Sequence, residues 1–419
     1  MFGKRDTEVL VVGAGPVGLF SALLLTERGI DVQIIDAEWR PAAHAYALAL
    51  HPKSLELLDG LGLAAPLVEQ GYRVNKVGLY DGATRAAELD LGRIGSKFPY
   101  VLVMPQSDLE SALTASLDSR KVKVQWDHRV SELVADGPRT VAVVDRWEKE
   151  SVGYATSGVQ RIIGKTFKTH FDLAVAADGH RSTMRRLVDI GFEQTARADQ
   201  FAVFEFETDA DLGHELRIVL KDGLASVLWP LPGGRCRWSF QLPPEEEVDA
   251  ERPKSRLSVQ IGERTFPHMT PDYLTRVIGE RAPWFRGSIG EVNWSLVVRF
   301  ERRLADRFGQ GRVWLCGDSG HLAGPAAVQS MNVGLREAAD LAARFNAILR
   351  GGKPLQILDE YNVERLSEWR RLLRVEGGLR ATSGASPWVA QNAAAIQGCI
   401  PASGEHLLQL AGQLGLEMA

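Results

Sequence analysis

The chain has 419 residues, of which 45% are apolar and 24% are charged, and its formal net charge is −4. A chain of this length and ordinary globular composition predicts two interleaved domains or one large α/β body. The small net charge gives no support for a nucleic-acid partner, and no apolar stretch is long enough to cross a bilayer.

The cysteines also limit the class of protein. There are three of them, Cys236, Cys316 and Cys399, and they lie far apart without the spacing of metal ligands. An odd number of scattered cysteines is typical of a reduced protein. The N-terminus enters a predicted strand within a few residues, which leaves no room for a signal peptide. We therefore expect a cytoplasmic protein without a metal site.

The predicted elements alternate between strands and helices. In chain order we expect strands at residues 7–12, 31–36, 122–126, 171–176 and 313–316, and helices at residues 16–27, 54–60, 107–117 and 331–349. The helix from Ser107 opens with a possible capping box that reaches Glu110. Residues 201–242 alternate between apolar and polar, which predicts an antiparallel sheet. Residues 243–253 predict an exposed loop, and the tail beyond Gly377 predicts one or two helices.

The loop between the first strand and the first helix predicts a dinucleotide site. Gly13 permits a tight turn, Gly15 lets the backbone approach a pyrophosphate, and Gly18 lets the helix pack close to the sheet. The helix N-terminus supplies unpaired N–H groups for the phosphates. Asp36 ends the second strand, where a carboxylate can accept hydrogen bonds from ribose hydroxyls.

Two further motifs follow predicted strands. Gly317-Asp318 stands at a strand end with a helix beyond it, which suits a flavin. Asp318 can accept from ribityl hydroxyls, and the helix N-terminus can stabilise negative charge on the reduced ring. Asp178-Gly179 opens another helix. Taken singly, each motif is also an ordinary strand-to-helix turn.

In this order and at these separations, the three motifs resemble those of the para-hydroxybenzoate-hydroxylase family of single-component (group A) FAD-dependent aromatic monooxygenases. The matching positions are residues 13–18 with Asp36, Asp178-Gly179 with Ser182 and Arg185, and Gly317-Asp318. Supporting matches lie at residues 50–58, 105–110 and 361–365. The resemblance runs from Val9 to about Arg371, which is most of the chain.

The resemblance implies an α/β fold, α+β overall, in which a Rossmann-like FAD-binding domain is interleaved with an antiparallel-sheet substrate domain, plus C-terminal helices. We expect the FAD-binding domain in residues 1–78, 98–195 and 305–350. The substrate domain is expected in residues 79–97 and 196–304, and the C-terminal helical region in residues 351–419.

The resemblance also assigns cofactor contacts to individual positions. At the adenosine half, it places Gly13, Gly15, Pro16, Val17 and Gly18 at the phosphates, Asp36 at the ribose, and Arg40 and Val130 near the adenine. Gln106 is placed at the flavin-side phosphate or ribityl chain, Asp318 at the ribityl chain, and Asp178 near FAD and NAD(P)H. The residues placed against the isoalloxazine are Pro325, Ser330, Met331 and Asn332.

Two departures from the family pattern affect the expected chemistry. After Pro325 the family carries Gly-Gly-Gln-Gly, whereas this chain has side chains at Ala327, Val328 and Ser330, so either the loop is displaced or the oxygen chemistry is altered. Tyr46 stands where the family commonly has an arginine that seats FAD, and a phenol cannot replace that charge. Tyr46 either contacts the substrate pocket or is structural. Tyr46 and Pro325 are the candidate catalytic residues, both in positioning roles.

The family mechanism implies that NADPH or NADH reduces FAD, that reduced FAD and molecular oxygen form a C4a-hydroperoxide, and that this species hydroxylates an aromatic or polycyclic small molecule. Candidate substrate-lining residues in the alternating section are Phe204, Arg217, Trp229 and Arg237. Because side chains alternate between the faces of a strand, we expect about half of them to point away from the substrate. His44, His51 and His321 lie near the expected flavin segments, and we interpret them as packing histidines rather than proton relays.

Two other functions are compatible with these motifs. One is an FAD-dependent reductase or dehydrogenase of the same fold that does not insert oxygen, which the altered loop after Pro325 favours. The other is a non-catalytic flavoprotein. Neither the substrate, the choice between NADH and NADPH, nor the oligomeric state follows from the sequence.

Overall fold

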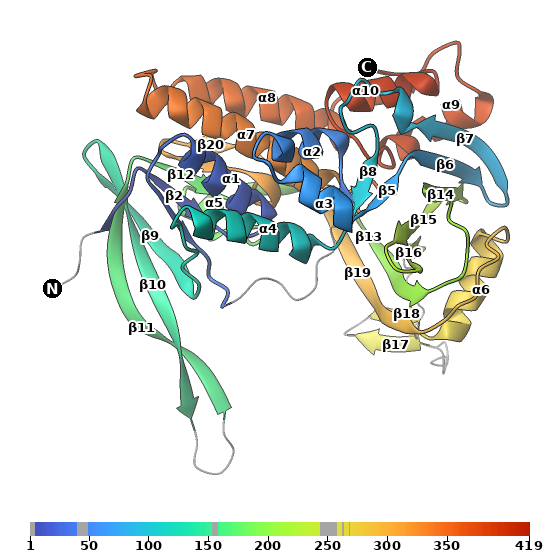
Figure 1. Cartoon of the computed structure of the whole chain (residues 1–419), viewed down its shortest axis with the longest axis horizontal. Coiled ribbons are helices and arrows are strands. Elements are labelled where there is room, and N and C mark those ends of the chain that lie inside the picture. The colour runs from blue at the N-terminus through green and yellow to red at the C-terminus, as the bar shows by residue number, and fades with distance from the viewer. Residues whose placement is uncertain (1–4, 40–48, 153–157, 244–257, 262–263, 268) are drawn as a thin grey trace.

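The computed structural model describes residues 5–39, 49–152, 158–243, 258–261, 264–267 and 269–419. It confirms the predicted fold class, a mixed α/β architecture with a parallel sheet and a separate, mainly antiparallel sheet (Figure 1). Arg40, His44 and Tyr46 lie outside the described residues, as does most of the predicted loop at residues 243–253. Within the described ranges, no helix is both long enough and apolar enough to span a membrane.

A five-stranded sheet forms the centre of the first unit. Its order is β20 (Gly309–Gln310), β21 (Val313–Leu315), β12 (Leu173–Ala176), β2 (Val9–Val12) and β3 (Val32–Ile35). All pairs are parallel except the one at the β20 edge. Strands β2 and β12 are buried throughout, as continuous apolar runs in a parallel sheet should be. The carboxyl ends of β2, β12 and β21 therefore meet at one edge, where the three motifs follow.

Helices surround this sheet. They are α1 (Pro16–Glu27), α2 (Pro52–Asp59), α3 (Ala64–Gln70), α4 (Gln106–Ser119), α5 (Thr183–Leu187), α7 (Gln329–Leu349) and α8 (Ile357–Leu372). Helix α1 packs against both α4 and α7, and α7 also contacts α2 and α8. Helix α1 begins with Pro16 after the extended Gly15, which is the position where proline is best tolerated.

An eight-stranded sheet forms the second unit. Its order is β22 (His321–Leu322), β19 (Val292–Ala305), β13 (Phe192–Glu207), β16 (Arg235–Gln241), β15 (Leu224–Leu231), β14 (Glu215–Lys221), β6 (Lys76–Asp81) and β7 (Thr84–Asp90). The predicted antiparallel pairing holds from β22 to β14, but β14 pairs with β6 in parallel. A separate apolar core fills the space between this sheet and α6 (Pro271–Arg281).

The smaller sheets complete the fold. Strands β1 (Arg5–Asp6), β11 (Gly158–Phe171), β10 (Arg139–Val152) and β9 (His128–Asp136) form one of them. Beyond the end of β9, strands β10 and β11 continue as a two-stranded ribbon that leaves the body of the fold (Figure 1). Strands β4 (Ala49–Leu50), β8 (Val101–Val103) and β5 (Tyr72–Val74) form another, and β17 (Ser258–Ile261) pairs with β18 (Arg264–Pro267).

The C-terminal segment agrees with the expectation of one or two helices and adds a sheet. It contains α9 (Pro387–Gln397) and α10 (Glu405–Gln413), and the short strands β23 (Leu379–Ala381) and β24 (Leu416–Met418) pair on either side of them. The hydrogen bonds from Gly95 N–H to Gln409 and from Asp90 N–H to Gln413 join this segment to the turn that follows β7.

Two local predictions were wrong. Residues 122–126 do not form a strand, because the only ladder contact is a single bridge between Gln125 and Ile35. The capping box at Ser107 is absent, because Pro105 occupies the position before the helix and Ser107 lies inside its first turn. With Pro105 as the residue before the helix, α4 begins at Gln106, two residues earlier than a capping Ser107 would require.

Candidate active site

The three glycines of the first loop have different surroundings. A Cβ at Gly13, where φ is +104°, would lie 2.2 Å from the Ala177 carbonyl oxygen, and a Cβ at Gly18 would lie 1.9 Å from the Gly13 carbonyl oxygen. A Cβ at Gly15 would meet nothing within 4 Å. Gly13 and Gly18 thus permit close packing of loop, sheet and helix, while Gly15 faces open space at the N-terminus of α1. That open, electropositive cradle suits a diphosphate.

Asp36 follows β3 and supports this loop. Its Oδ2 accepts from the Ala14 N–H at 2.6 Å and its Oδ1 accepts from the Glu38 N–H at 2.7 Å. Burial raises the pKa of Asp36, although these two backbone donors act in the opposite direction. Each carboxylate oxygen can accept a second hydrogen bond, so the group still has capacity for ribose hydroxyls. Val130 is buried in β9, which starts beside Asp36 through the bond from His128 N–H to the Asp36 carbonyl.

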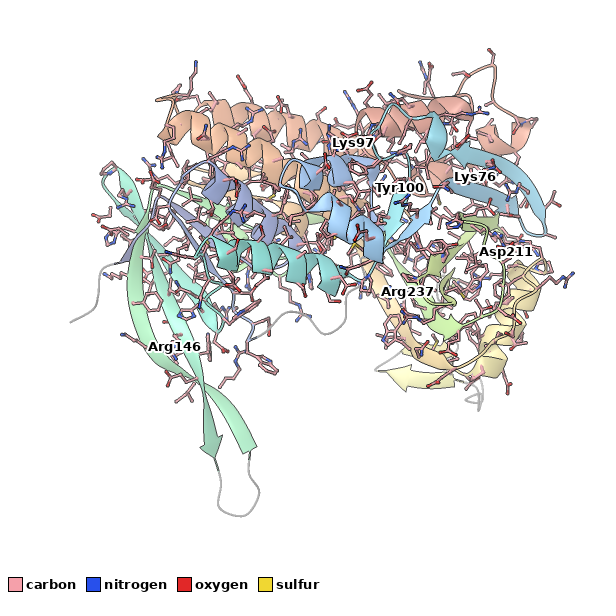
Figure 2. The ribbon with its side chains drawn as sticks, viewed as in Figure 1. Lys76, Lys97, Tyr100, Arg146, Asp211 and Arg237 are labelled. Atoms are coloured by element: carbon pink, nitrogen blue, oxygen red, sulfur yellow. The ribbon has the colours of Figure 1, made fainter. Side chains whose placement is uncertain are left out.

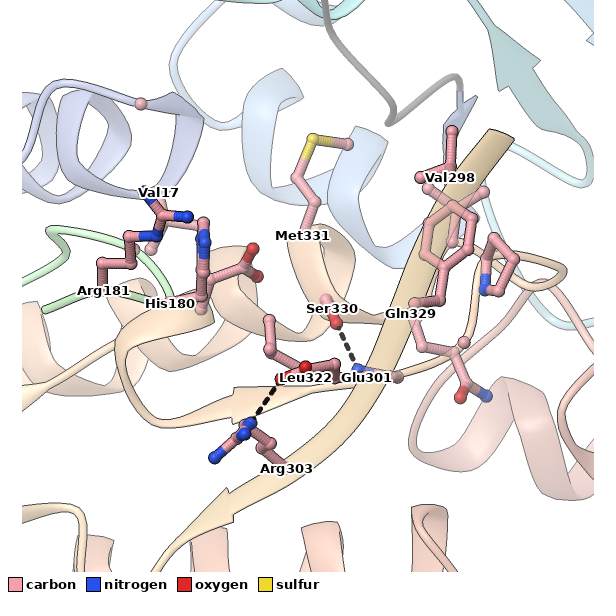
Figure 3. Close-up of a pocket in the computed structure, with 18 of the residues that line it drawn as sticks. Val17, His180, Arg181, Val298, Glu301, Arg303, Leu322, Gln329, Ser330 and Met331 are labelled. Carbon is pink, nitrogen blue, oxygen red and sulfur yellow. Dashed lines mark hydrogen bonds and ion pairs between the residues drawn. The ribbon is translucent and has the colours of Figure 1, made fainter. Parts of the chain in front are cut away.

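A cavity of about 1100 Å³ lies at the carboxyl ends of the parallel strands (Figure 3). Among its lining residues are the predicted cofactor residues Gly15, Pro16, Val17, Gln106, Asp318, Pro325, Ser330 and Met331. The structure therefore brings together residues from the first loop, from α4 and from the segment around α7. Gly13, Gly18, Asp36, Val130, Asp178 and Asn332 are not among the residues that line this cavity.

Asp318 is the free carboxylate of this cavity. It lies in the 3-10 turn Gly317–Ser319 that follows β21, and its side chain makes no hydrogen bond within the part of the chain that the structure describes. Burial raises the pKa of Asp318, whereas His321 and His180 lower it. An acceptor without a donor in a buried wall suits a ligand that carries hydroxyl groups. Gln106 lines the same cavity and donates from Nε2 to Glu110 at 2.7 Å.

Asp178 has a structural role at the N-terminus of α5. Its carboxylate accepts from the Ser182 hydroxyl at 2.5 Å and from the N–H groups of Thr183 and Met184 at 2.7 and 3.1 Å. Burial raises the pKa of Asp178, and these donors oppose the shift. The neighbouring residues Ala177, Gly179 and His180 line the cavity. Asp178 therefore holds the shape of a loop whose other residues face the cavity.

Asn332 likewise acts through neighbouring segments. Its Oδ1 accepts from the His51 N–H and the Ser54 hydroxyl, both at 2.7 Å, and its Nδ2 donates to the carbonyls of Ala49 and Val328 at 2.9 and 2.8 Å. All the hydrogen-bonding capacity expected of a buried amide is thus used within the protein. Asn332 anchors the first turn of α7 to β4 and α2.

The loop after Pro325 places a non-glycine residue in a backbone conformation that glycine favours. Val328 is the residue before α7 and has φ +51° and ψ +40°, the left-handed conformation that disfavours a β-branched side chain. The His51 ring donates from Nε2 to the Ala327 carbonyl at 2.7 Å, and Asn332 holds the Val328 carbonyl. Ser330 accepts from the Ala323 N–H at 2.9 Å. These contacts keep the altered sequence in a tight turn beside the cavity.

Val328→Gly should make the protein more stable than Val328→Ala by about 1 kcal/mol, because only glycine removes the cost of the left-handed backbone. Both changes remove the same packing atoms except for one methyl group, so the comparison isolates the backbone. Thermal unfolding of the two purified variants measures the difference. An alanine variant as stable as the glycine variant would show that the turn carries no strain.

His51 is a buried neutral histidine, as its packing interpretation requires. Burial lowers the pKa of His51 to about 4, although the hydrogen bond to the Ala327 carbonyl acts to raise it. The unfolded chain therefore binds more protons than the native protein between about pH 6.5 and pH 4, and native stability falls as the pH falls through that window. We expect this group to cost up to about 3 kcal/mol at the acid end. Urea unfolding at about pH 7 and about pH 5 should show a smaller pH effect in His51→Gln than in the unmodified protein.

The sheet residues predicted to contact substrate divide between its two faces. Phe204 is fully buried in the core facing α6. On the same side, the guanidinium carbon of Arg217 lies 5.2 Å from the centroid of the Trp284 ring. Trp229 pairs with Arg237, which Figure 2 labels, across β15 and β16 on the other face. There a guanidinium nitrogen of Arg237 lies 2.9 Å from a carboxylate oxygen of Glu205. None of these four residues lines the cavity. No contact in the described structure supports a substrate-lining role for them.

Strand β19 supplies the cavity wall that sequence reasoning did not identify. Leu296, Val298 and Phe300 form an apolar strip, and Arg299, Glu301 and Arg303 also line the cavity. Glu301 accepts from both arginines, at 3.0 and 2.5 Å, and Figure 3 shows Arg303 beside it. The available signal was the apolar run at residues 296–298 followed by Phe300, but such a run does not reveal which face of a strand meets a cavity.

Comparisons with known proteins agree with this geometry. A family model described as "FAD binding domain" matches residues 6–375. The chain belongs to this FAD-binding family, which confirms the family predicted from the motifs. The open cradle at Gly15 and the free acceptor at Asp318 fit FAD independently of that match.

Among its relatives, 6-methylpretetramide 4-monooxygenase of Streptomyces rimosus is 29% identical over 375 residues, which cover 87% of this chain and 60% of the relative. Pentachlorophenol 4-monooxygenase of Sphingobium chlorophenolicum is 25% identical over 382 residues, covering 88% and 64%. The chain thus spans less than two thirds of the length of these two relatives. The crystal structure of p-nitrophenol 4-monooxygenase from Pseudomonas putida superposes with a TM-score of 0.68 at 19% identity, covering 98% of this chain and 92% of the other, and shows the same fold.

Proposed function

We propose that this protein is an FAD-dependent monooxygenase that uses NADPH or NADH and molecular oxygen to hydroxylate an aromatic or polycyclic small molecule. One observation carries the proposal. A single cavity is lined on one side by Gly15, Val17 and Asp318 and on the other by the apolar strip of β19. The same space can therefore hold a dinucleotide against the first unit and a flat apolar substrate against the second.

When bound, FAD would accept hydride from the nicotinamide and activate dioxygen for transfer of one oxygen atom to an aromatic carbon. The protein's own residues bind and orient the partners. The N-terminus of α1 meets the phosphates, Asp318 accepts from hydroxyl groups, and the first turn of α7, which carries no acidic side chain, presents free N–H groups to the cavity.

The wall of β19 would orient the substrate and exclude water. Val298 is buried, and Phe300 packs edge-on against Phe201 at 5.6 Å between ring centroids, so this part of the wall is rigid. Leu296 is 44% exposed and offers an uncovered apolar surface to a ring. At the rim, the Arg181 guanidinium makes no hydrogen bond or ion pair with any described residue and is available to the phosphates of the reductant.

All three cysteines are free and buried, and we propose a cytoplasmic location.

A second candidate is a reductase or dehydrogenase of the same fold that does not insert oxygen. Val328 favours it, because its side chain and the buried Ala327 stand where a glycine loop would leave space beside the cofactor.

Isotopically labelled dioxygen distinguishes the two candidates. The holoprotein would be incubated with NADPH or NADH and a panel of phenols and polycyclic aromatics, and the products analysed by mass spectrometry. We expect one labelled oxygen atom in a hydroxylated product. Consumption of reductant with hydrogen peroxide as the sole oxygen product, for every compound in the panel, would contradict the proposal, and reduction of a substrate without oxygen would support the second candidate.

A further inference from the structure

Glu337 of α7 is a charged group that the proposed function does not use. Its side chain is fully buried, and three donors converge on it. The Gly317 N–H and the His321 Nε2 donate to Oε2 at 2.8 and 2.9 Å, and the Trp369 indole N–H donates to Oε1 at 2.7 Å. His321 stacks on Trp369 with 3.7 Å between ring centroids. The cluster therefore joins the turn after β21 to α7 and α8.

This cluster lies directly beneath Asp318. Gly317, which gives its N–H to Glu337, has φ +67°, and a Cβ there would meet Val17 at 3.0 Å. On the other side of the turn, Arg185 donates to the Ser319 carbonyl at 2.8 Å. The orientation of the Asp318 side chain is thus set by hydrogen bonds on either side of it, while its own carboxylate makes none within the described residues.

The chemistry of the cluster requires a carboxylate. All three partners donate, so both oxygens of residue 337 must accept, and a neutral amide would direct its NH₂ group against a donor. Burial disfavours the charge on Glu337, but His321, Arg365 and the Gly317 N–H outweigh it, and the pKa of Glu337 lies below its ordinary value. A buried charge held by this many donors is costly to disturb.

We propose that Glu337 is a positioning residue for FAD binding, which acts by holding the Gly317–Ser319 turn so that the Asp318 carboxylate faces the ribityl hydroxyls. The inference rests on the proposed role of Asp318. His321 belongs to the same device as a second donor to Oε2, whereas Trp369 donates only to Oε1, the oxygen that does not hold the turn.

The test measures the FAD dissociation constant of reconstituted apoprotein by flavin fluorescence, together with the flavin absorption spectrum and the urea midpoint of the apoprotein. Glu337→Gln should raise the dissociation constant about tenfold or more. Trp369→Phe, which removes a donor but leaves the carboxylate, should change it by less than about threefold. The double variant should recover most of the affinity, because the amide NH₂ can then face the vacated side while its oxygen accepts from Gly317.

A double-mutant cycle with Asp318→Ala separates positioning from general destabilisation. If Glu337 acts through Asp318, Glu337→Gln should change the FAD dissociation constant by less than about twofold in the Asp318→Ala background. Full additivity of the two effects, or wild-type FAD affinity in Glu337→Gln, would overturn the inference. Unchanged affinity in Asp318→Ala alone would instead show that the proposed role of Asp318 is wrong. Should Glu337→Gln not fold alone, the Glu337→Gln/Trp369→Phe variant takes its place. Its recovered affinity should again depend on Asp318, so Asp318→Ala should raise the FAD dissociation constant in this background as it does in the unmodified protein. An effect of Asp318→Ala in the unmodified protein but not in this background would overturn the inference.

Discussion

Gly15→Ala should abolish retention of FAD while leaving the apoprotein folded. Nothing in the structure lies within 4 Å of a Cβ at this position, and the backbone there, with φ −73° and ψ 179°, is one that alanine adopts readily. The added methyl group would project into the open space at the N-terminus of α1, where the diphosphate must approach the backbone. We expect the FAD dissociation constant to rise about a hundredfold or more.

Equilibrium dialysis of apoprotein against FAD measures this effect, and urea unfolding measures stability in the same samples. The apoprotein midpoint should fall by no more than the equivalent of about 1 kcal/mol, the usual cost of alanine at a helix N-cap. Gly279→Ala in α6 is the matched control, because a Cβ there also meets nothing within 4 Å. That control should bind FAD normally. Normal FAD binding by Gly15→Ala would show that the diphosphate does not approach this loop.

Gly18→Ala should have the opposite pattern and destabilise the apoprotein by about 3 kcal/mol or more. A Cβ at this position would lie 1.9 Å from the Gly13 carbonyl oxygen, and the contacted atom is backbone rather than the end of a flexible side chain. Relief requires α1 to move away from β2 and from the loop between them. Because α1 also packs on α4 and α7, that movement would open several contacts at once.

The urea midpoint of the apoprotein and its far-ultraviolet circular dichroism test this prediction. Gly15→Ala serves as its control, since the same methyl group is added three residues earlier in the same loop without a clash. An apoprotein midpoint for Gly18→Ala equal to that of the unmodified protein would mean that α1 and β2 pack less closely than the structure shows.

Several elements could be predicted because their signals are local. The helix at α1 has the same bounds in sequence and structure, since Pro16 and the glycine after the helix mark both ends. The strands β2, β3, β12 and β21 were recognisable as short buried runs between turn signals. The strand expected at residues 122–126 failed because the alternation of Val122, Val124 and Trp126 with polar residues also occurs where a chain packs with no ladder partner beyond a single bridge.

The long hairpin of β10 and β11 was not predicted, although it is the most extended feature of the fold. Its strands carry mixed polar and apolar residues, so no clear period of two emerged from the sequence. The parallel pairing of β14 with β6 was equally hidden, because the two strands are separated by more than a hundred residues. Pairing between distant segments depends on which edges remain open after the rest of the sheet has formed.

For the candidate site, the sequence by itself determined that the glycine loop, Asp36 and Asp318 stand at the ends of predicted strands; their contacts with a cofactor stay a prediction. Each follows a strand in a parallel sheet, and the carboxyl ends of such strands must meet at one edge. Only the tertiary structure decided which side chains face the cavity and which hold others in place. The carboxylate of Asp178 and the amide of Asn332 hold neighbouring segments by hydrogen bonds, and residues of β19 line the cavity. The buried Glu337 accepts a hydrogen bond from Gly317, the residue before Asp318. The physical reason is that a side chain's role depends on the donors and acceptors brought to it by distant segments, and spacing along the chain does not contain that information.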